Sequence, residues 1–265
     1  MKRIIVLASV LLLAACKNSE TQKETQNTYS EETLDVTTTV YPDNIAQVFK
    51  AHGTLEAWNT FESLVFEIEK PGGNEKTTTA LKNRESLIET PSHAIGFDGK
   101  EVWLQQKDTT TYKGNAKFYY NLMFYFYAMP YVLADDGIIY TDVEPLEFDG
   151  QTYPGVKIGY EAGVGESPED EYIIYFNKDT HQMEWLGYTV TYFSKEKSND
   201  FHLIKYSEWQ MVEGIKLPKT LDWYKSEEGK PTTKSRSANF TNILLSKSKI
   251  NANDFAKPEN AKVVE

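Results

Sequence analysis

The stretch Asn115 to Pro130, NAKFYYNLMFYFYAMP, interrupts a chain that otherwise shows the pattern of β-strands. Asn115 can cap the start of a helix and Pro130 cannot continue one, which predicts a helix between them. Because apolar and aromatic side chains fall on every face, this helix would be surrounded by other elements. We therefore expect a central aromatic helix that plugs the open side of a curved sheet. A buried strand is the alternative, since aromatic residues also favour strands.

Two interpretations of the aromatic segment remain open. Its side chains can form plain core, or they can form the wall of an apolar cavity in which flexible methionines adapt to a ligand. The candidate cavity residues are Phe118, Tyr119, Leu122, Met123, Phe126, Met129 and, from a predicted strand, Trp103. Either way, the segment belongs to the interior of the domain.

Strand and turn signals dominate on both sides of this segment. Asp98-Gly99 and Asp149-Gly150 lie between short apolar runs, which is a strong signal for hairpins. Further strands are expected in residues 61–69, 172–176, 183–193, 201–212, 215–224 and 239–245, with Glu213-Gly214 as the turn between 201–212 and 215–224. A helix is expected from Ile45 to Gly53, with Thr54 capping one more turn. The pattern indicates a mainly β, α+β domain in which an antiparallel meander curls into a half-barrel.

The first 16 residues have the features of an export signal. Lys2 and Arg3 precede an apolar run from Ile4 to Leu13, which is too short to span a bilayer. The sequence Leu-Ala-Ala-Cys that ends at Cys16 resembles the lipobox of bacterial lipoproteins. That resemblance implies removal of residues 1–15 and attachment of acyl chains to Cys16, which would hold the protein on a membrane.

The segment 16–44 is rich in serine, threonine, asparagine, glutamine and glutamate, and we expect a disordered tether there. Residues 45–265 then form a single domain. The net charge of −11 makes binding to nucleic acid improbable, because phosphate backbones would be repelled. Cys16 is the only cysteine and lipidation would consume it, so disulfides, thiolate catalysis and cysteine metal sites are excluded.

The sequence specifies no enzymatic reaction. The motifs H-E-x-x-H and G-x-S-x-G are absent, so common signatures of zinc proteases and serine hydrolases are missing. His52 falls on the apolar face of the first predicted helix, which favours a buried core histidine over a catalytic base. We expect no catalytic residue, no metal and no cofactor.

Four stretches resemble an uncharacterised family of lipoproteins from Bacteroidota-type bacteria: Ala51–Trp58 (AHGTLEAW), Gly96–Trp103 (GFDGKEVW), Met129–Asp135 (MPYVLAD) and Gly187–Tyr192 (GYTVTY). The layout of helix, meander, central plug and final strand is also similar, more distantly, to the lipoprotein-carrier superfamily of the Lol system. That second resemblance implies an incomplete barrel whose apolar cavity shields acyl chains. The first implies no specific activity.

Three hypotheses for the function follow. The first is a membrane-anchored, non-enzymatic module that binds a lipid or a lipoprotein in an apolar cavity. The second is a structural or interaction lipoprotein of an envelope assembly or a glycan uptake system, and the third is a hydrolase that uses carboxylates or His52. Lys17 after the cysteine favours the outer membrane, with the domain facing the periplasm or the cell surface.

Overall fold

The computed structural model describes residues 41–134, 137–160 and 169–264. The predicted signal peptide, the lipidation site Cys16 and the tether up to residue 40 lie outside the described residues. The helical elements are α1 (Asp43–Ala51), α2 (Leu55–Trp58), α3 (Ala116–Tyr119), α4 (Leu122–Tyr127) and the 3₁₀ helices η1 (Tyr131–Ala134) and η2 (Ala252–Phe255). Of these described helices, none has both the length and the apolar character that crossing a bilayer requires.

Thirteen strands form one open antiparallel sheet, and most of them pair with their neighbours in the sequence. The strands are β1 (Ser63–Ile68), β2 (Glu75–Ala80), β3 (Ser86–Glu89), β4 (His93–Phe97), β5 (Val102–Gln106), β6 (Ile138–Phe148), β7 (Gln151–Tyr160), β8 (Tyr172–Phe176), β9 (Met183–Tyr188), β10 (His202–Val212), β11 (Ile215–Glu227), β12 (Lys230–Ser246) and β13 (Lys262–Val263). Their order is β13-β5-β4-β3-β2-β1-β12-β11-β10-β9-β8-β7-β6, so the sheet has two edges and is not closed into a barrel.

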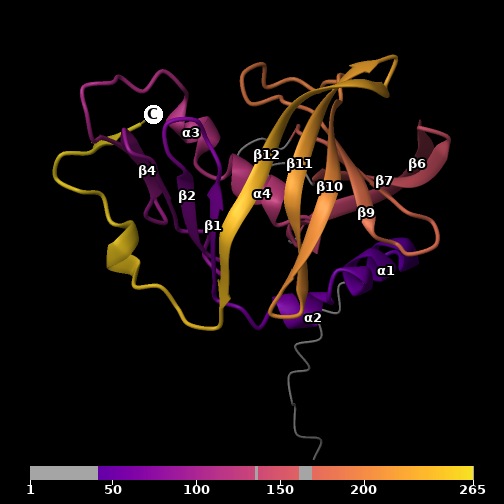
Figure 1. Ribbon diagram of the computed structural model, residues 1–265, viewed down its shortest axis with the longest axis horizontal. Helices are drawn as coiled ribbons and strands as arrows, with labels where there is room; N and C mark the ends of the chain where they lie inside the picture. Colours follow the sequence, from indigo (N-terminus) through magenta and orange to yellow (C-terminus); the bar gives the residue numbers. More distant parts are fainter. Residues whose placement is uncertain (1–40, 135–136, 161–168, 265) are drawn as a thin grey trace, which may run out of the picture. The chain divides into compact units, whose positions relative to one another are not determined.

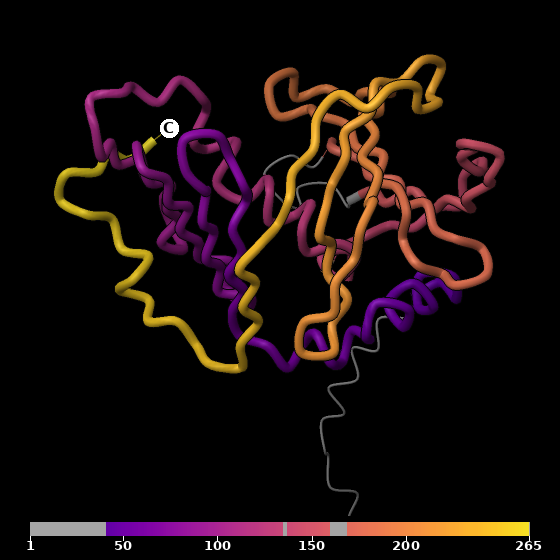
Figure 2. Tube along the Cα trace, in the orientation of Figure 1, coloured from indigo at the N-terminus to yellow at the C-terminus, as the bar shows by residue number. Residues whose placement is uncertain are grey.

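The sheet consists of two meanders, β1 to β5 and β6 to β12, which meet where β1 pairs with β12 (Figures 1 and 2). After β12 the chain returns past η2, and β13 pairs with β5 at the far edge. The predicted fold class, an antiparallel meander that curls into an open half-barrel, is therefore confirmed.

Tight turns of the predicted kind connect the long strands. Asp149-Gly150 and Glu213-Gly214 both have positive φ at both residues, 50° and 72° in the first pair and 50° and 83° in the second. A hairpin turn with two consecutive residues at positive φ has a twist that matches the twist of the flanking strands. A third pair, Glu228-Gly229, has the same geometry and begins β12 at Lys230, earlier than the expected residue 239. The first part of β12 is mainly polar and exposed. It therefore lacks the apolar alternation from which a strand is predicted.

The aromatic segment forms two short α-helices in place of the single predicted helix. The Asn115 side chain accepts a hydrogen bond from the Phe118 amide, which confirms the predicted cap of α3. The chain leaves helical geometry at Asn121, where φ is −125° and ψ is 0°, and α4 then ends before Pro130. Asparagine disfavours a helix interior because its side chain competes for backbone hydrogen bonds, which accounts for the break.

The interior of the half-barrel is filled by α4, which lies behind β11 and β12 in Figure 1. The Phe126 ring contacts Tyr188 of β9 and Trp223 of β11, with centroids 4.8 and 6.1 Å away. The Tyr127 ring lies 4.5 Å from both Phe66 of β1 and Phe240 of β12. Strands of both meanders therefore pack against the same two turns of helix.

Candidate binding pocket

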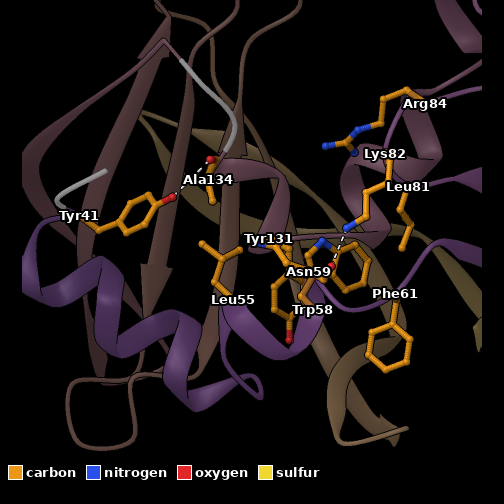
Figure 3. Close-up of a pocket in the computed structure, with 10 residues that line it drawn as sticks. All are labelled: Tyr41, Leu55, Trp58, Asn59, Phe61, Leu81, Lys82, Arg84, Tyr131 and Ala134. Atoms are coloured by element: carbon orange, nitrogen blue, oxygen red, sulfur yellow. Dashed lines mark hydrogen bonds between the residues drawn. The ribbon is translucent and has the colours of Figure 1, made fainter. Parts of the chain in front are cut away.

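A pocket of about 450 Å³ lies beside the filled interior, between α2, η1 and the turn that joins β2 to β3 (Figure 3). Most of the lining residues are aromatic or aliphatic, with two basic residues and one amide, but the surface that they expose to the pocket is mainly polar. The lining residues are Tyr41, Leu55, Trp58, Asn59, Phe61, Leu81, Lys82, Arg84, Tyr131 and Ala134.

The floor of the pocket is a pair of stacked rings. Trp58 at the end of α2 and Tyr131 at the start of η1 are nearly parallel, with centroids 4.5 Å apart and planes inclined by 7°. The Tyr131 hydroxyl donates a hydrogen bond to the carbonyl oxygen of His52. Burial raises the pKa of Tyr131 far above its ordinary value, so the hydroxyl keeps its proton and remains a donor. This hydrogen bond thus fixes the Tyr131 ring of the stack.

The local sequence of α2 explains why its side chains face the pocket. Thr54 has a φ of 74° and caps the helix, because its Oγ1 accepts a hydrogen bond from the Ala57 amide at 3.2 Å. Positions three apart lie on one helix face, so Leu55 and Trp58 point to the same side. The predicted cap at Thr54 is confirmed by this hydrogen bond.

The opposite side of the pocket is cationic. Lys82 and Arg84 both come from the β2–β3 turn, and the Lys82 side chain reaches toward the stacked rings, whereas the Arg84 side chain lies above them in Figure 3. The Lys82 Nζ donates to the Asn59 carbonyl oxygen at 2.6 Å, and the Arg84 Cζ lies 5.0 Å from the centre of the Phe124 ring. The described lining residues include neither aspartate nor glutamate. The pocket therefore brings two basic side chains close to a pair of stacked rings.

The start of the folded chain also belongs to this pocket. Tyr41 packs its ring against Phe49 of α1, with centroids 5.2 Å apart, and its hydroxyl donates to the Ala134 carbonyl oxygen at 3.4 Å. Both contacts hold the first described residue against α1 and η1. The described chain therefore begins at the edge of the pocket.

The residues predicted to line a cavity lie elsewhere. Phe126, Met123 and Met129 are buried in the core, with exposed fractions of 2%, 6% and 0%, and Leu122 packs against that core. Phe118 contacts the rings of Tyr192 and Phe193. None of these lines the pocket, so their part in binding stays a prediction.

Tyr119 and Trp103 have structural partners. The Tyr119 hydroxyl donates to Glu75 Oε1 at 2.8 Å, and Lys70 Nζ donates to Glu75 Oε2 at 2.6 Å. Trp103 lies over Gly96, where a Cβ atom would be 2.1 Å from the indole ring, and its Nε1 donates to the Phe255 carbonyl oxygen at 2.9 Å. The Trp103 ring therefore fastens the C-terminal segment to the sheet.

The sequence reasoning missed the pocket residues themselves. Leu81, Lys82 and Arg84 lie in a polar turn without apolar periodicity, so no pattern distinguishes them from an ordinary surface turn. The family resemblance was a weaker signal for these pocket residues. Two of the stretches quoted above, Ala51–Trp58 and Met129–Asp135, contribute the two rings that stack on the pocket floor.

His52 is a core histidine, as expected. Its side chain is fully buried, with Nδ1 at 2.7 Å from the Val48 carbonyl oxygen and Nε2 accepting from the Met183 amide at 3.4 Å. Burial lowers the pKa of His52 to about 4, and Lys216 acts in the same direction. The ring is therefore neutral and inaccessible to a substrate. Within the described ranges, no group of three or more His, Cys, Asp or Glu residues could hold a metal ion.

Comparison with known proteins gives a family and distant structural relatives. A family model described as "Family of unknown function (DUF6503)" matches residues 92–237, more than half of the chain. No curated protein matches the chain.

Two solved structures illustrate the structural likeness. A DUF1329 family protein from Desulfovibrio piger is 13% identical, with a TM-score of 0.45, and the match covers 77% of this chain and 94% of that one. A LolA superfamily protein from Nitrosomonas europaea is 9% identical, with a TM-score of 0.45, over 77% of this chain and 96% of that one.

Proposed function

The chain belongs to the DUF6503 family, a family of unknown function, and on that premise we propose that it is a non-enzymatic envelope module that binds the acyl part of a lipid or lipoprotein. The observation that carries the proposal is the pocket beside α2 and η1. Its volume of about 450 Å³ falls within the range of roughly 300–1,000 Å³ that is usual for sites of small ligands.

The aromatic and aliphatic side chains of the pocket are the part that would contact an acyl chain. Trp58, Tyr131 and Leu55 lie on one side, and Leu81 and Phe61 on the other. Transfer of each CH₂ group from water to an apolar surface contributes about 0.8 kcal/mol. Since most of the surface exposed in the pocket is polar and Trp58 and Tyr131 are nearly buried, the proposal is limited to a short part of an acyl chain.

The proposed anchor places this pocket near a membrane. Export and acylation of Cys16 rest on the sequence, and Lys17 favours the outer membrane, with the domain in the periplasm or at the cell surface. A flexible tether from Cys16 to Tyr41 would span roughly 30 Å root-mean-square. A tether of this length would keep the domain within reach of the membrane that holds the acyl chains.

Binding can be measured with the unlipidated Cys16→Ser protein and 1-palmitoylglycerol below its aggregation concentration. We expect saturable binding by native mass spectrometry, and Asn59→Trp should weaken it at least tenfold because the exposed Asn59 lines the pocket mouth. Asn253→Trp, an equally exposed position on η2 away from the pocket, is the matched control and should bind like the parent protein. Absence of binding by the parent protein, or undiminished binding by Asn59→Trp, would refute the proposal.

A further inference from the structure

We infer that the loop between β9 and β10 docks the domain on a bilayer surface that contains anionic lipids. In this contact Phe193 enters the headgroup region, and Lys195 and Lys197 face the lipid phosphates. The contact goes beyond the proposed function, because the loop and the pocket share no residue. It depends on the proposed anchor only in that the anchor would keep a bilayer nearby.

The ring of Phe193 is displayed on the surface of the domain. It is 67% exposed, which is the highest value among the exposed large hydrophobic residues that the structure describes. The rings of Phe118 and Tyr192 lie beside it, with centroids 5.3 and 5.1 Å away. Peripheral membrane elements insert phenylalanine among the lipid headgroups, and tyrosine is enriched at the same depth. These three rings, the aromatic tip, therefore have the composition of a membrane contact.

Hydrogen bonds fix the loop on both sides of Phe193. The buried Thr191 donates from its amide and its hydroxyl to Asp170 Oδ1, at 2.6 and 2.7 Å. The Lys195 amide then donates to the Thr191 carbonyl oxygen at 2.7 Å. Because the backbone is already ordered on either side of the exposed ring, docking would cost little conformational entropy.

The charge beside the aromatic tip favours anionic lipids. Lys195 Nζ lies 4.3 Å from the centre of the Tyr192 ring, and Lys197 is exposed two residues later. Neither lysine forms an ion pair with any residue that the structure describes. Residues 192–198 contain these two lysines and a single carboxylate, Glu196, whereas the whole chain has 39 acidic and 28 basic residues. The loop is thus locally positive on an acidic protein, which suits a negative surface.

The size of the aromatic tip favours a bilayer over a protein partner. A stable protein interface buries about 800 Å² on each side. Even three fully exposed rings would supply only about 450–750 Å², and Phe118 and Tyr192 are partly covered. A weak contact is sufficient for a bilayer when a tether holds it at high effective concentration.

The chain before the domain has the length that this contact needs. Residues 17–40 would connect the domain to acyl chains at Cys16, and a segment of this length can extend to roughly 80 Å. In Figure 1, α3 lies toward the end of the domain opposite α1 and α2. The aromatic tip, which includes Phe118 of α3, can therefore face the membrane although the described chain begins beside α1.

The test measures sedimentation with vesicles, using the expected mature chain 16–265 with Cys16→Ser, which carries no acyl chain. Vesicles of equal parts phosphatidylglycerol and phosphatidylcholine are compared with pure phosphatidylcholine. At low salt we expect at least about fivefold tighter binding to the anionic vesicles, and the difference should shrink as salt is added.

Variants assign this binding to the loop. Phe193→Ser should weaken binding to the anionic vesicles about tenfold, and Lys195→Gln and Lys197→Gln should each weaken it about fivefold. Met211→Ser is the matched control for the ring, because Met211 is 62% exposed near the β10–β11 turn. Lys178→Gln, at an exposed position in the turn between β8 and β9, is the control for charge. Both controls should bind like the parent protein.

The outcomes separate this contact from the proposed function. Absence of vesicle binding, equal binding to both kinds of vesicle, or undiminished binding by Phe193→Ser would overturn the membrane contact. Binding of 1-palmitoylglycerol should be unchanged in Phe193→Ser, and vesicle binding should be unchanged in Asn59→Trp. Each of the two activities can therefore fail while the other remains.

Discussion

The interior beneath α4 and the pocket beside η1 are formed by neighbouring parts of the chain, the aromatic segment and the 3₁₀ helix that follows it, yet their rings are enclosed differently. Phe126 of α4 meets rings from β9 and β11. Tyr131 of η1 stacks on Trp58 of a four-residue helix, and a turn lies opposite. Similar rings are therefore packed against long strands in one region and border a pocket between short elements in the other.

The largest effect on stability is expected when a buried ring is removed from the interior beneath α4. Phe126→Ala should lower the free energy of unfolding by about 3–5 kcal/mol, because it removes a buried ring and leaves a void between α4 and the sheet. Urea unfolding followed by circular dichroism measures the loss. Phe193→Ala is the matched control, because this ring is 67% exposed and its removal should cost no more than about 0.5 kcal/mol. A loss below about 1 kcal/mol for Phe126→Ala would mean that the interior is loosely packed, as a ligand chamber would be.

The next effect concerns His52, which joins the two regions. Its carbonyl oxygen accepts from the Tyr131 hydroxyl and from the Lys216 amide, while its ring is buried beside Trp209. Because burial lowers the pKa of His52 to about 4, the unfolded chain takes up a proton below pH 6.5 while the folded protein does not. The contribution of the neutral His52 to the free energy of unfolding is thus fully present above pH 6.5. It should fall by roughly 3 kcal/mol as the pH approaches 4.

The contribution of His52 can be isolated with His52→Gln, which does not titrate. Carboxylates also respond to acid, so the quantity to compare is the difference in unfolding free energy between the parent protein and the variant at each pH. This difference should change between pH 6.5 and 4 in favour of the variant. A constant difference would show that the histidine is not shielded from protons.

The smallest effect is expected at Thr54, which caps α2 beside the pocket. Thr54→Ala removes the hydrogen bond that caps α2 and keeps a Cβ atom at a φ of 74°, so it should lower stability by about 1 kcal/mol. Thr54→Gly loses the same hydrogen bond, but glycine adopts this backbone angle without strain. It should therefore lower stability by only about 0.3 kcal/mol. Thermal unfolding of both variants tests the order. A glycine variant that is less stable than the alanine variant would contradict the role given to the backbone.

Much of the fold could be predicted because particular residues have strong local preferences. Asp149-Gly150 and Glu213-Gly214 marked hairpin turns, and Asn115 and Thr54 marked helix starts, since each of these signals acts within a few residues. The buried aromatic character of residues 115–130 also indicated correctly that the sheet is filled from one side.

Other parts could not be predicted because tertiary contacts override the local pattern. In β2 the residues that face inward are Glu75, Thr77 and Thr79, all nearly fully buried, so the expected apolar alternation is absent. Glu75 is tolerated there because Lys70 and Tyr119 bind both its oxygen atoms. The pocket was equally hidden, since it depends on how α2, η1 and the β2–β3 turn meet.

The pairing of β1 with β12 has a consequence for how the protein is made. Ser63 pairs with Ser246, so the second strand of this pair is synthesised long after the first. Until residue 246 has emerged, β1 and β11 each keep an unsatisfied row of backbone groups that can pair with another chain. Contacts of such large sequence separation also form slowly. A newly made chain is therefore open to aggregation from the time that β1 emerges until β12 has been synthesised.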